Sequence, residues 1–201
     1  MSTLLKNNKP LLVGLTGGIG SGKTTIAKVF TVMGIPVFNS DNVAKDIINS
    51  NDEVIAAIKR QFGSVYTNNI LDAKKMADIV FNDQSALQQL NNIVHPKVAE
   101  YFNNWVKENS AESILIKEAA ILIESGAYQQ MDKIILVTAP EKIRIDRVME
   151  RDEVGEAKVK ERMSKQLSDT EKASYADYII DNSDTQLVIP QVLKIKEQLK
   201  K

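Results

Sequence analysis

The segment Gly14–Thr25, GLTGGIGSGKTT, constrains the fold of this chain more than any other stretch, because five of its twelve residues are glycine and one is lysine. An apolar run, Leu11–Thr16, leads into it, which predicts a buried strand. Apolar residues at helical spacing follow it, at Ile26, Val29, Phe30 and Met33. The motif G-x-x-x-x-G-K-[ST] is satisfied by Gly17, Gly22, Lys23 and Thr24. A strand, this motif and a helix in succession predict a phosphate-binding loop rather than a merely flexible glycine turn.

Such a loop binds the phosphates of a nucleotide through backbone N–H groups, and side chains on the loop would keep the phosphates away. The positive end of the following helix adds to the attraction. We expect Lys23 to reach the β- and γ-phosphates of ATP and the Thr24 hydroxyl to bind Mg²⁺. The residues predicted to contact the nucleotide are Gly17, Gly18, Ile19, Gly20, Ser21, Gly22, Lys23, Thr24 and Thr25.

The rest of the chain alternates between strands and helices. Further strands are predicted in the apolar segments IPVFNS (35–40), SILIKEAAILIE (113–124), KIILVT (133–138) and YIID (178–181). Helices are predicted between them, one of them opening at Pro96, and an amphipathic helix closes the chain from Val188 to Leu199. This order predicts an α/β fold with a five-stranded, mostly parallel sheet flanked by helices, with ligands at the carboxyl ends of the strands.

The length of 201 residues predicts a single domain. Within it we expect a nucleotide-binding core at residues 1–41, 111–140 and 173–201, a helical insertion at residues 42–110 that binds the acceptor, and a lid at residues 141–172.

Composition excludes several classes of site. The chain has no Cys and one His, which rules out disulfides, cysteine zinc sites and histidine metal clusters. Lys plus Arg and Asp plus Glu both number 26, so nothing in the net charge favours nucleic acid or an anionic membrane. We therefore expect a soluble cytoplasmic protein that binds neither nucleic acid nor membranes.

Two carboxylates stand at ends of predicted strands. Asp41 follows the second strand, where a general base would meet an acceptor hydroxyl. The alternative is that Ser40 or Asp41 caps the next helix. Glu118 would hold Mg²⁺ or orient the acceptor, and the alternative is a surface carboxylate.

Three arginines, Arg144, Arg147 and Arg151, step by three and four along one face of a predicted helix, and Arg162 can join them. Cations that close over a γ-phosphate and exclude water would act as a lid. The alternative is a solvated helix whose arginines pair with Glu141, Asp146 and Glu150. His95 stands before Pro96, so we expect it to be extended at a helix start, either structural or bonded to substrate.

Six blocks in order resemble the dephospho-coenzyme A kinase family over nearly the whole chain. They are GLTGGIGSGKTT, the segment around Asp41, VHP (94–96), ILIE (121–124), ERDEVGEAKVKERMSKQ (150–166) and ADYIIDNS (176–183). The resemblance implies a phosphate-loop kinase fold related to nucleoside monophosphate kinases, acting as a monomer or small homo-oligomer. It also implies transfer of the γ-phosphoryl group of ATP, with Mg²⁺, to the ribose 3′-hydroxyl of dephospho-coenzyme A.

The same resemblance implies roles for single residues. Asp41 matches the family's proposed base, and Lys23, Arg147 and Arg151 match cations around the phosphates. His95 matches a position near the acceptor, with Glu118 and Arg162 also on the substrate side, and Asn182 lies in the block expected near the adenine. The chain departs from the family where Asn39, Ser40 and Asp41 replace Asp-Ala-Asp, where Glu118 replaces Asp, and where Asp184 replaces a common glycine.

Two other functions agree with the phosphate loop. One is a kinase for another small acceptor, since the loop does not read the acceptor. The other is a nucleotide-controlled binding module, for which Asp152–Gly155 supplies a D-x-x-G run, although it follows a predicted helix.

Overall fold

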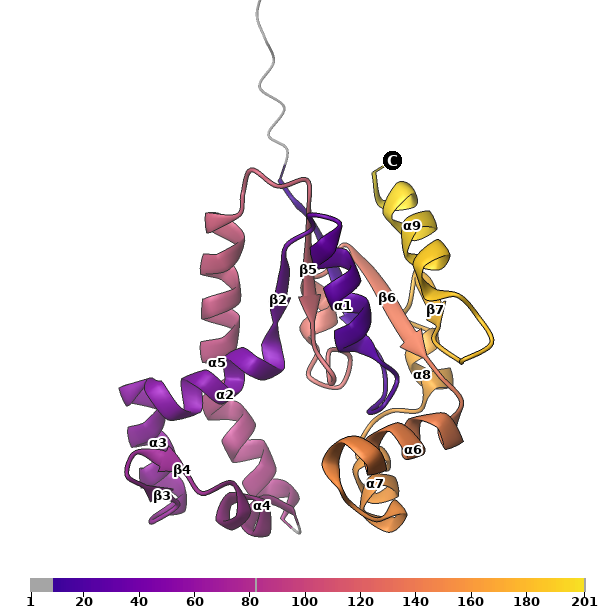
Figure 1. Ribbon diagram of the computed structural model, residues 1–201. Helices are drawn as coiled ribbons and strands as arrows, with labels where there is room; N and C mark the ends of the chain where they lie inside the picture. The colour runs from indigo at the N-terminus through magenta and orange to yellow at the C-terminus, as the bar shows by residue number, and fades with distance from the viewer. Residues whose placement is uncertain (1–8, 82, 201) are drawn as a thin grey trace, which may run out of the picture. The chain divides into compact units, whose positions relative to one another are not determined.

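The computed structural model describes residues 9–81 and 83–200. The chain divides into two compact units, one formed by the residues up to Phe38 together with those from Asn109 onward, the other by Asn39–Glu108. Figure 1 labels the elements of both units. No helix among the described residues is long and apolar enough to cross a membrane.

The first unit is built on a five-stranded sheet with the order β2-β5-β1-β6-β7. Its strands are β1 (Leu11–Thr16), β2 (Val37–Asn39), β5 (Ile114–Glu118), β6 (Lys133–Thr138) and β7 (Tyr178–Asp181). β1 pairs in parallel with both β5 and β6, and β6 pairs in parallel with β7. The central strands β1, β5 and β6 are buried over most of their length on both faces, which agrees with their nearly continuous apolar runs. The predicted α/β fold is confirmed.

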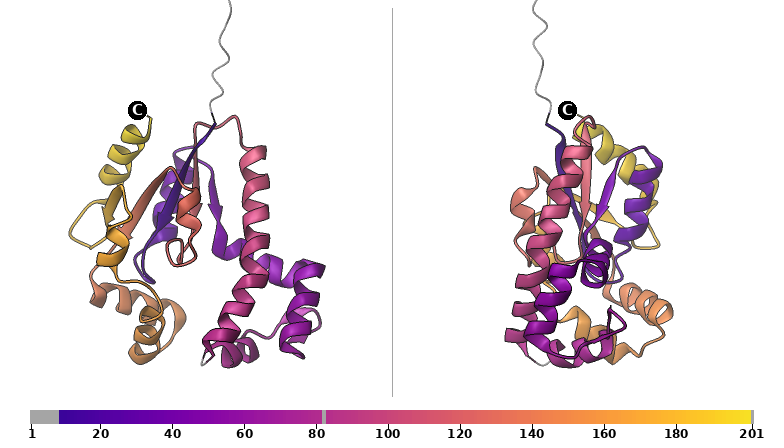
Figure 2. Two further views of the ribbon diagram at one scale, coloured as in Figure 1. Left: turned by 180° about the vertical axis from the view of Figure 1, so that it is seen from behind. Right: turned by 90° about the vertical axis from the view of Figure 1, so that its left-hand side faces the viewer.

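One face of the sheet is covered by α1 (Lys23–Val32) and α9 (Val188–Leu199). Figures 1 and 2 show both helices on the same side of the strands. Their buried side chains form one core with the strands, and this core includes Ile26, Phe30, Val13, Leu15, Ile116, Val137, Val192 and Ile195. The predicted apolar stripe of the last helix therefore packs on the sheet.

The predicted strand over residues 113–124 is wrong in its second half. β5 ends at Glu118, and residues 120–125 form turns that lead to a short 3₁₀ helix, Ala127–Gln130. The apolar character of this segment has another cause, because Leu122 is fully buried against the face of β1 at Gly14. A Cβ atom at Gly14 would lie only 2.5 Å from Leu122 Cδ2, so the glycine makes room for that side chain.

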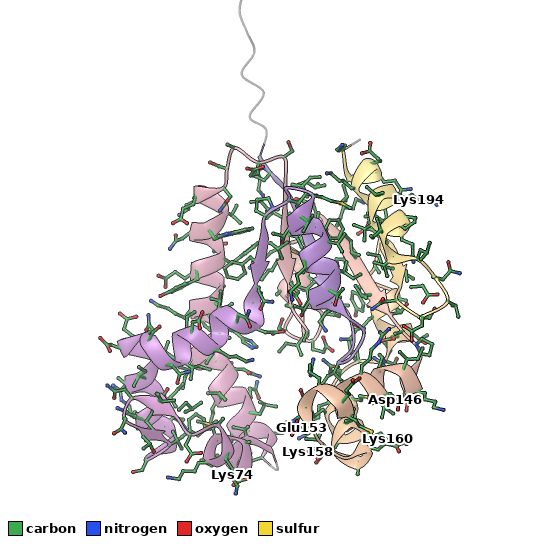
Figure 3. All side chains as sticks on the ribbon, in the orientation of Figure 1. Lys74, Asp146, Glu153, Lys158, Lys160 and Lys194 are labelled. Atoms are coloured by element: carbon green, nitrogen blue, oxygen red, sulfur yellow. The ribbon has the colours of Figure 1, made fainter. Side chains whose placement is uncertain are left out.

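The region expected to be the lid forms three helices, α6 (Glu141–Asp152), α7 (Glu156–Met163) and α8 (Asp169–Ala173). α6 and α7 pack through Ile145, Val148 and Val159, whereas Lys158 and Lys160 on either side of Val159 are exposed (Figure 3). The short α8, which we did not predict, begins with a capping box between Ser168 and Glu171.

The second unit contains α2 (Ser40–Ser50), α3 (Asp52–Phe62), α4 (Ala73–Phe81) and the 25-residue α5 (Gln84–Glu108). The other three helices pack along α5. A two-stranded hairpin, β3 (Tyr66–Thr67) and β4 (Ile70–Leu71), turns at Asn68 and Asn69, which both have positive φ. Asparagine tolerates this conformation better than most residues do.

Pro96 does not open a helix as predicted, because it lies inside α5, and His95 is therefore helical and not extended. Proline removes one backbone hydrogen bond from a helix interior. α5 continues through Pro96 with Val94 and Val98 buried on either side of it, and α2, α3 and α4 pack along the helix.

Candidate active site

The phosphate-loop segment 17–22 connects the carboxyl end of β1 to the amino end of α1. Gly22 is the N-cap of α1 in the left-handed region, with φ 91°, and no side chain caps the helix. The amino end of this 10-residue helix, which no side chain caps, is the kind of helix terminus that attracts an anion.

Gly20 allows the loop to lie directly against α6. Its φ is 79°, and a Cβ atom there would overlap the carbonyl oxygen of Arg144 and lie 2.9 Å from the Arg144 Cα atom. The glycines of this loop therefore serve contacts within the protein as well as clearance for a ligand.

Lys23, the first residue of α1, is buried and folds back over the loop. Its Nζ atom donates to the carbonyl oxygen of Gly17 at 2.9 Å and to that of Gly18 at 3.3 Å. The ammonium group is thereby held beside the loop, where a phosphate would bind.

Thr24 and Glu118 meet at the carboxyl ends of β1 and β5. The Thr24 hydroxyl donates to Glu118 Oε1 at 2.9 Å, and Glu118 is only 3% exposed. A hydroxyl and a carboxylate are oxygen donors of the kind that Mg²⁺ prefers. Among the described residues, no group of three or more acidic or histidine side chains could hold a metal by itself. A metal here would need further oxygen ligands from water or a bound nucleotide.

Lys117, which was not among the residues singled out from the sequence, is a buried lysine in the same strand as Glu118. Burial lowers its pKa to about 8. Neighbouring residues of a strand point to opposite faces, so Lys117 does not point to the side of the sheet on which Glu118 lies. A lysine at the end of an apolar strand is the only sequence signal for it.

Asn182, the residue after β7, forms a hydrogen bond to the phosphate loop. Its Nδ2 atom donates to the carbonyl oxygen of Ser21 at 2.8 Å. Arg147 Nη2 donates to the Asn182 carbonyl oxygen at 3.0 Å and to Asp184 at 2.8 Å. Arg147 Nη1 is buried with no hydrogen-bond partner among the described residues, as is the Ser21 hydroxyl. Unsatisfied buried donors beside this loop fit a site for an anionic ligand.

The four arginines do not converge on one point, and only Arg151 and Arg162 share a partner. Arg144 pairs with Asp169 at 3.2 Å, and its Nη1 atom lies against Gly18. Arg151 and Arg162 share Asp152, at 2.8 Å and 2.6 Å. These arginines hold the pKa of Asp152 down at about 2, Arg151 contributing most. The ion-pair partners of these arginines differ from the acidic residues that the sequence suggested. One of the suggested partners, Asp146, is exposed on α6 (Figure 3).

Asp41 and His95 belong to the second unit, whereas the phosphate loop belongs to the first. Asp41 is exposed in the first turn of α2, and His95 is half-buried on α5. The alternative interpretation, a helix cap at Ser40 or Asp41, is wrong, because Asn39 is the N-cap and its Oδ1 atom accepts from Asn42 N at 2.8 Å. The Asp41 carboxylate is therefore not used to cap its own helix.

Two further polar side chains of the first unit were not among the predicted site residues. Gln166 Oε1 accepts from the backbone N–H of Ile19 in the phosphate loop at 2.8 Å. Glu124 Oε1 pairs with the fully buried Lys172 at 2.9 Å. Gln166 and Glu124 both lie in sequence blocks that resemble the family. The residues that they contact in the fold cannot be recognised from those blocks.

Comparison with known proteins identifies the family of this chain. Residues 11–187 match the family model described as dephospho-CoA kinase. The chain belongs to the dephospho-CoA kinase family. It is 40% identical over 189 residues to the dephospho-CoA kinase of Chlorobaculum tepidum, a match that covers 90% of each chain.

Solved structures show the same similarity. A crystal structure from Thermus thermophilus has a TM-score of 0.85 at 29% identity, covering 94% of this chain and 97% of the other. The dephospho-CoA kinase from Campylobacter jejuni has a TM-score of 0.69 at 25% identity, covering 94% and 96%. The family resemblance predicted from the residues is confirmed.

Proposed function

We propose that this chain transfers the γ-phosphoryl group of ATP to the ribose 3′-hydroxyl of dephospho-CoA, giving ADP and CoA. The observation that carries the proposal is a complete phosphate loop, with Lys23 and the Thr24–Glu118 pair beside it, in a chain that matches the family over residues 11–187. We further propose that it acts in the cytoplasm on these small molecules, without nucleic acid or membrane, as a monomer or small homo-oligomer.

The phosphate loop and the amino end of α1 would bind the β- and γ-phosphates through backbone N–H groups. Lys23 would exchange its contacts with the Gly17 and Gly18 carbonyl groups for the phosphates. Mg²⁺ would be held by Thr24, with Glu118 bonded to it directly or through water, and when bound it neutralises charge between the β- and γ-phosphates.

The arginines would contribute to different degrees. Arg147 could donate to a phosphate through Nη1 without giving up a hydrogen bond, because this buried nitrogen beside the loop has no partner among the described residues. Arg151 and Arg162 are paired with Asp152, and we propose that they turn toward a phosphate in a step in which the lid residues 141–172 move. Asn182 would support the loop through Ser21 and border the adenine.

The second unit overlaps most of the insertion proposed to bind the acceptor, residues 42–110. Asp41 would accept the proton of the 3′-hydroxyl, and His95 would hydrogen-bond the acceptor. Because the transition state of phosphoryl transfer is loose, the hydroxyl need not ionise first, and Asp41 assists rather than starts the reaction.

The test is a coupled ADP-release assay with ATP and Mg²⁺, comparing dephospho-CoA, adenosine monophosphate and no acceptor, with the product identified by mass. We expect ADP release only with dephospho-CoA, and one phosphate added to it. Release with adenosine monophosphate would favour another acceptor, and release without an acceptor would favour a nucleotide-controlled module.

The role of Asp41 is tested by Asp41→Asn. We expect kcat to fall by roughly 10²–10⁴ while ATP binding is kept, as for loss of a general base. Asp46→Asn is the matched control, since Asp46 is also exposed on α2. An unchanged kcat in Asp41→Asn, or an equal loss in both variants, would exclude this role.

A further inference from the structure

The peptide group between Gly18 and Ile19 is held from both sides. Its carbonyl oxygen, on Gly18, accepts from Lys23 Nζ at 3.3 Å and from Ser21 N at 3.1 Å. Its N–H group, on Ile19, donates to Gln166 Oε1 at 2.8 Å, across 147 residues of sequence. A peptide group is planar, so fixing the N–H direction fixes the direction of the carbonyl that receives the lysine.

The side chain of Ile19 adds an apolar contact to the same region. It packs against the cluster formed by Ile145, Val148 and Val159 of α6 and α7. Ile19 is therefore joined to residues 141–172 twice, by its side chain and by its backbone N–H.

The backbone next to Gln166 is held by an ion pair between Glu124 and the fully buried Lys172. The residue after Gln166, Leu167, donates its N–H to Glu124 Oε1 at 3.0 Å, and the same oxygen pairs with Lys172 Nζ at 2.9 Å. Lys172 is fully buried and also donates to the carbonyl oxygen of Ala120 at 3.2 Å. The backbone beside Gln166 is thus anchored to the segment after β5 and not only to α7.

We infer that Gln166 is a positioning residue for the phosphate loop: by binding the Ile19 N–H it sets the Gly18–Ile19 peptide plane, and through the Gly18 carbonyl it sets the resting place of Lys23. Gln166 touches no reacting atom in this role. The inference deepens the proposed function. The expected change in ATP binding rests on that function, whereas the expected change in Ile19 amide exchange does not.

The test replaces Gln166 with Met, which has similar length and no oxygen acceptor, and with Glu, which keeps the acceptor. Asp132→Leu is the matched control, because Asp132 Oδ2 accepts from the backbone N–H of Leu12 at 2.8 Å. Leu12 lies at the end of β1 away from the phosphate loop. Amide hydrogen exchange of Ile19 is followed by NMR in the nucleotide-free proteins. Dissociation constants for ATP and thermal midpoints are measured beside it.

We expect Gln166→Met to speed exchange of the Ile19 amide at least tenfold and to weaken ATP binding about tenfold, the size of one lost hydrogen bond. Gln166→Glu should retain slow exchange of this amide. Asp132→Leu should lower the thermal midpoint by about as much as Gln166→Met does. It should leave both the exchange rate of the Ile19 amide and the affinity for ATP unchanged.

Unchanged Ile19 exchange in Gln166→Met, or an equal loss of ATP binding in Asp132→Leu, would overturn the inference. The exchange measurement needs neither ATP nor an acceptor. If the wild-type chain fails to phosphorylate dephospho-CoA while Gln166→Met still frees the Ile19 amide, the proposed function fails and the positioning role stands.

Discussion

Replacing Gly20 with Ala should damage the protein far more than replacing Gly34 with Ala, although both glycines have φ 79°. An L-residue in this left-handed region costs about 1–2 kcal/mol, and the loss of glycine's freedom in the unfolded chain returns roughly 0.4–1 kcal/mol. Gly34 has nothing within 4 Å of an added Cβ atom. The net cost of Gly34→Ala should therefore be about 1 kcal/mol.

Gly20→Ala meets an additional obstacle, because its Cβ atom would overlap the backbone of Arg144 in α6. Backbone cannot rotate away as a side chain can, so the loop and α6 must separate. Overpacking of this kind adds about 1–3 kcal/mol. The total of about 3 kcal/mol corresponds to a fall in the thermal midpoint of roughly 6–12 °C, against about 2–4 °C for Gly34→Ala.

The two variants would be compared by thermal unfolding and by calorimetric titration with ATP. Gly20→Ala should also weaken ATP binding, because separation from α6 breaks the contacts that shape the loop, whereas Gly34→Ala should bind ATP normally. Equal midpoints and equal affinities in the two variants would refute the argument that Gly20 is required by the close approach of α6.

Three further predictions concern charged and polar groups of the site. Lys23→Ala should abolish phosphoryl transfer, measured as ADP release, since it removes the ammonium group that is held beside the loop at the Gly17 and Gly18 carbonyl groups. Thr24→Val should raise the Mg²⁺ concentration needed for half-maximal activity about tenfold, or about 1.4 kcal/mol, whereas Thr31→Val on the same helix, which loses a 3.1 Å bond to a backbone carbonyl, should not. Because the pKa of Asp152 is lowered from 3.8 to about 2, the stabilising effect of its carboxylate is complete above about pH 4 and is lost as the pH falls toward 2. The thermal midpoints of wild type and Asp152→Asn should therefore converge between pH 4 and pH 2. A constant difference between the two midpoints over this range would contradict the argument.

Local patterns were sufficient wherever structure follows from neighbouring residues. The strand Leu11–Thr16, the loop motif after it and the amphipathic last helix all appear as expected, because periodicity and glycine placement act within a few residues. Pro96 and the segment after Glu118 were misread for the same reason. A local proline signal predicts a helix start, and an apolar run predicts a strand, but packing along α5 and the burial of Leu122 decided otherwise.

The sequence by itself determined the type of site, because a phosphate loop requires glycine, lysine and threonine at a fixed spacing that is visible without any fold. Tertiary structure alone decided which distant groups complete it. Gln166 on Ile19, Asn182 on Ser21 and the backbone of Arg144 against Gly20 join residues more than a hundred positions apart. No local propensity encodes such pairs, since they exist only after the parallel strands have brought their carboxyl ends to one edge of the sheet.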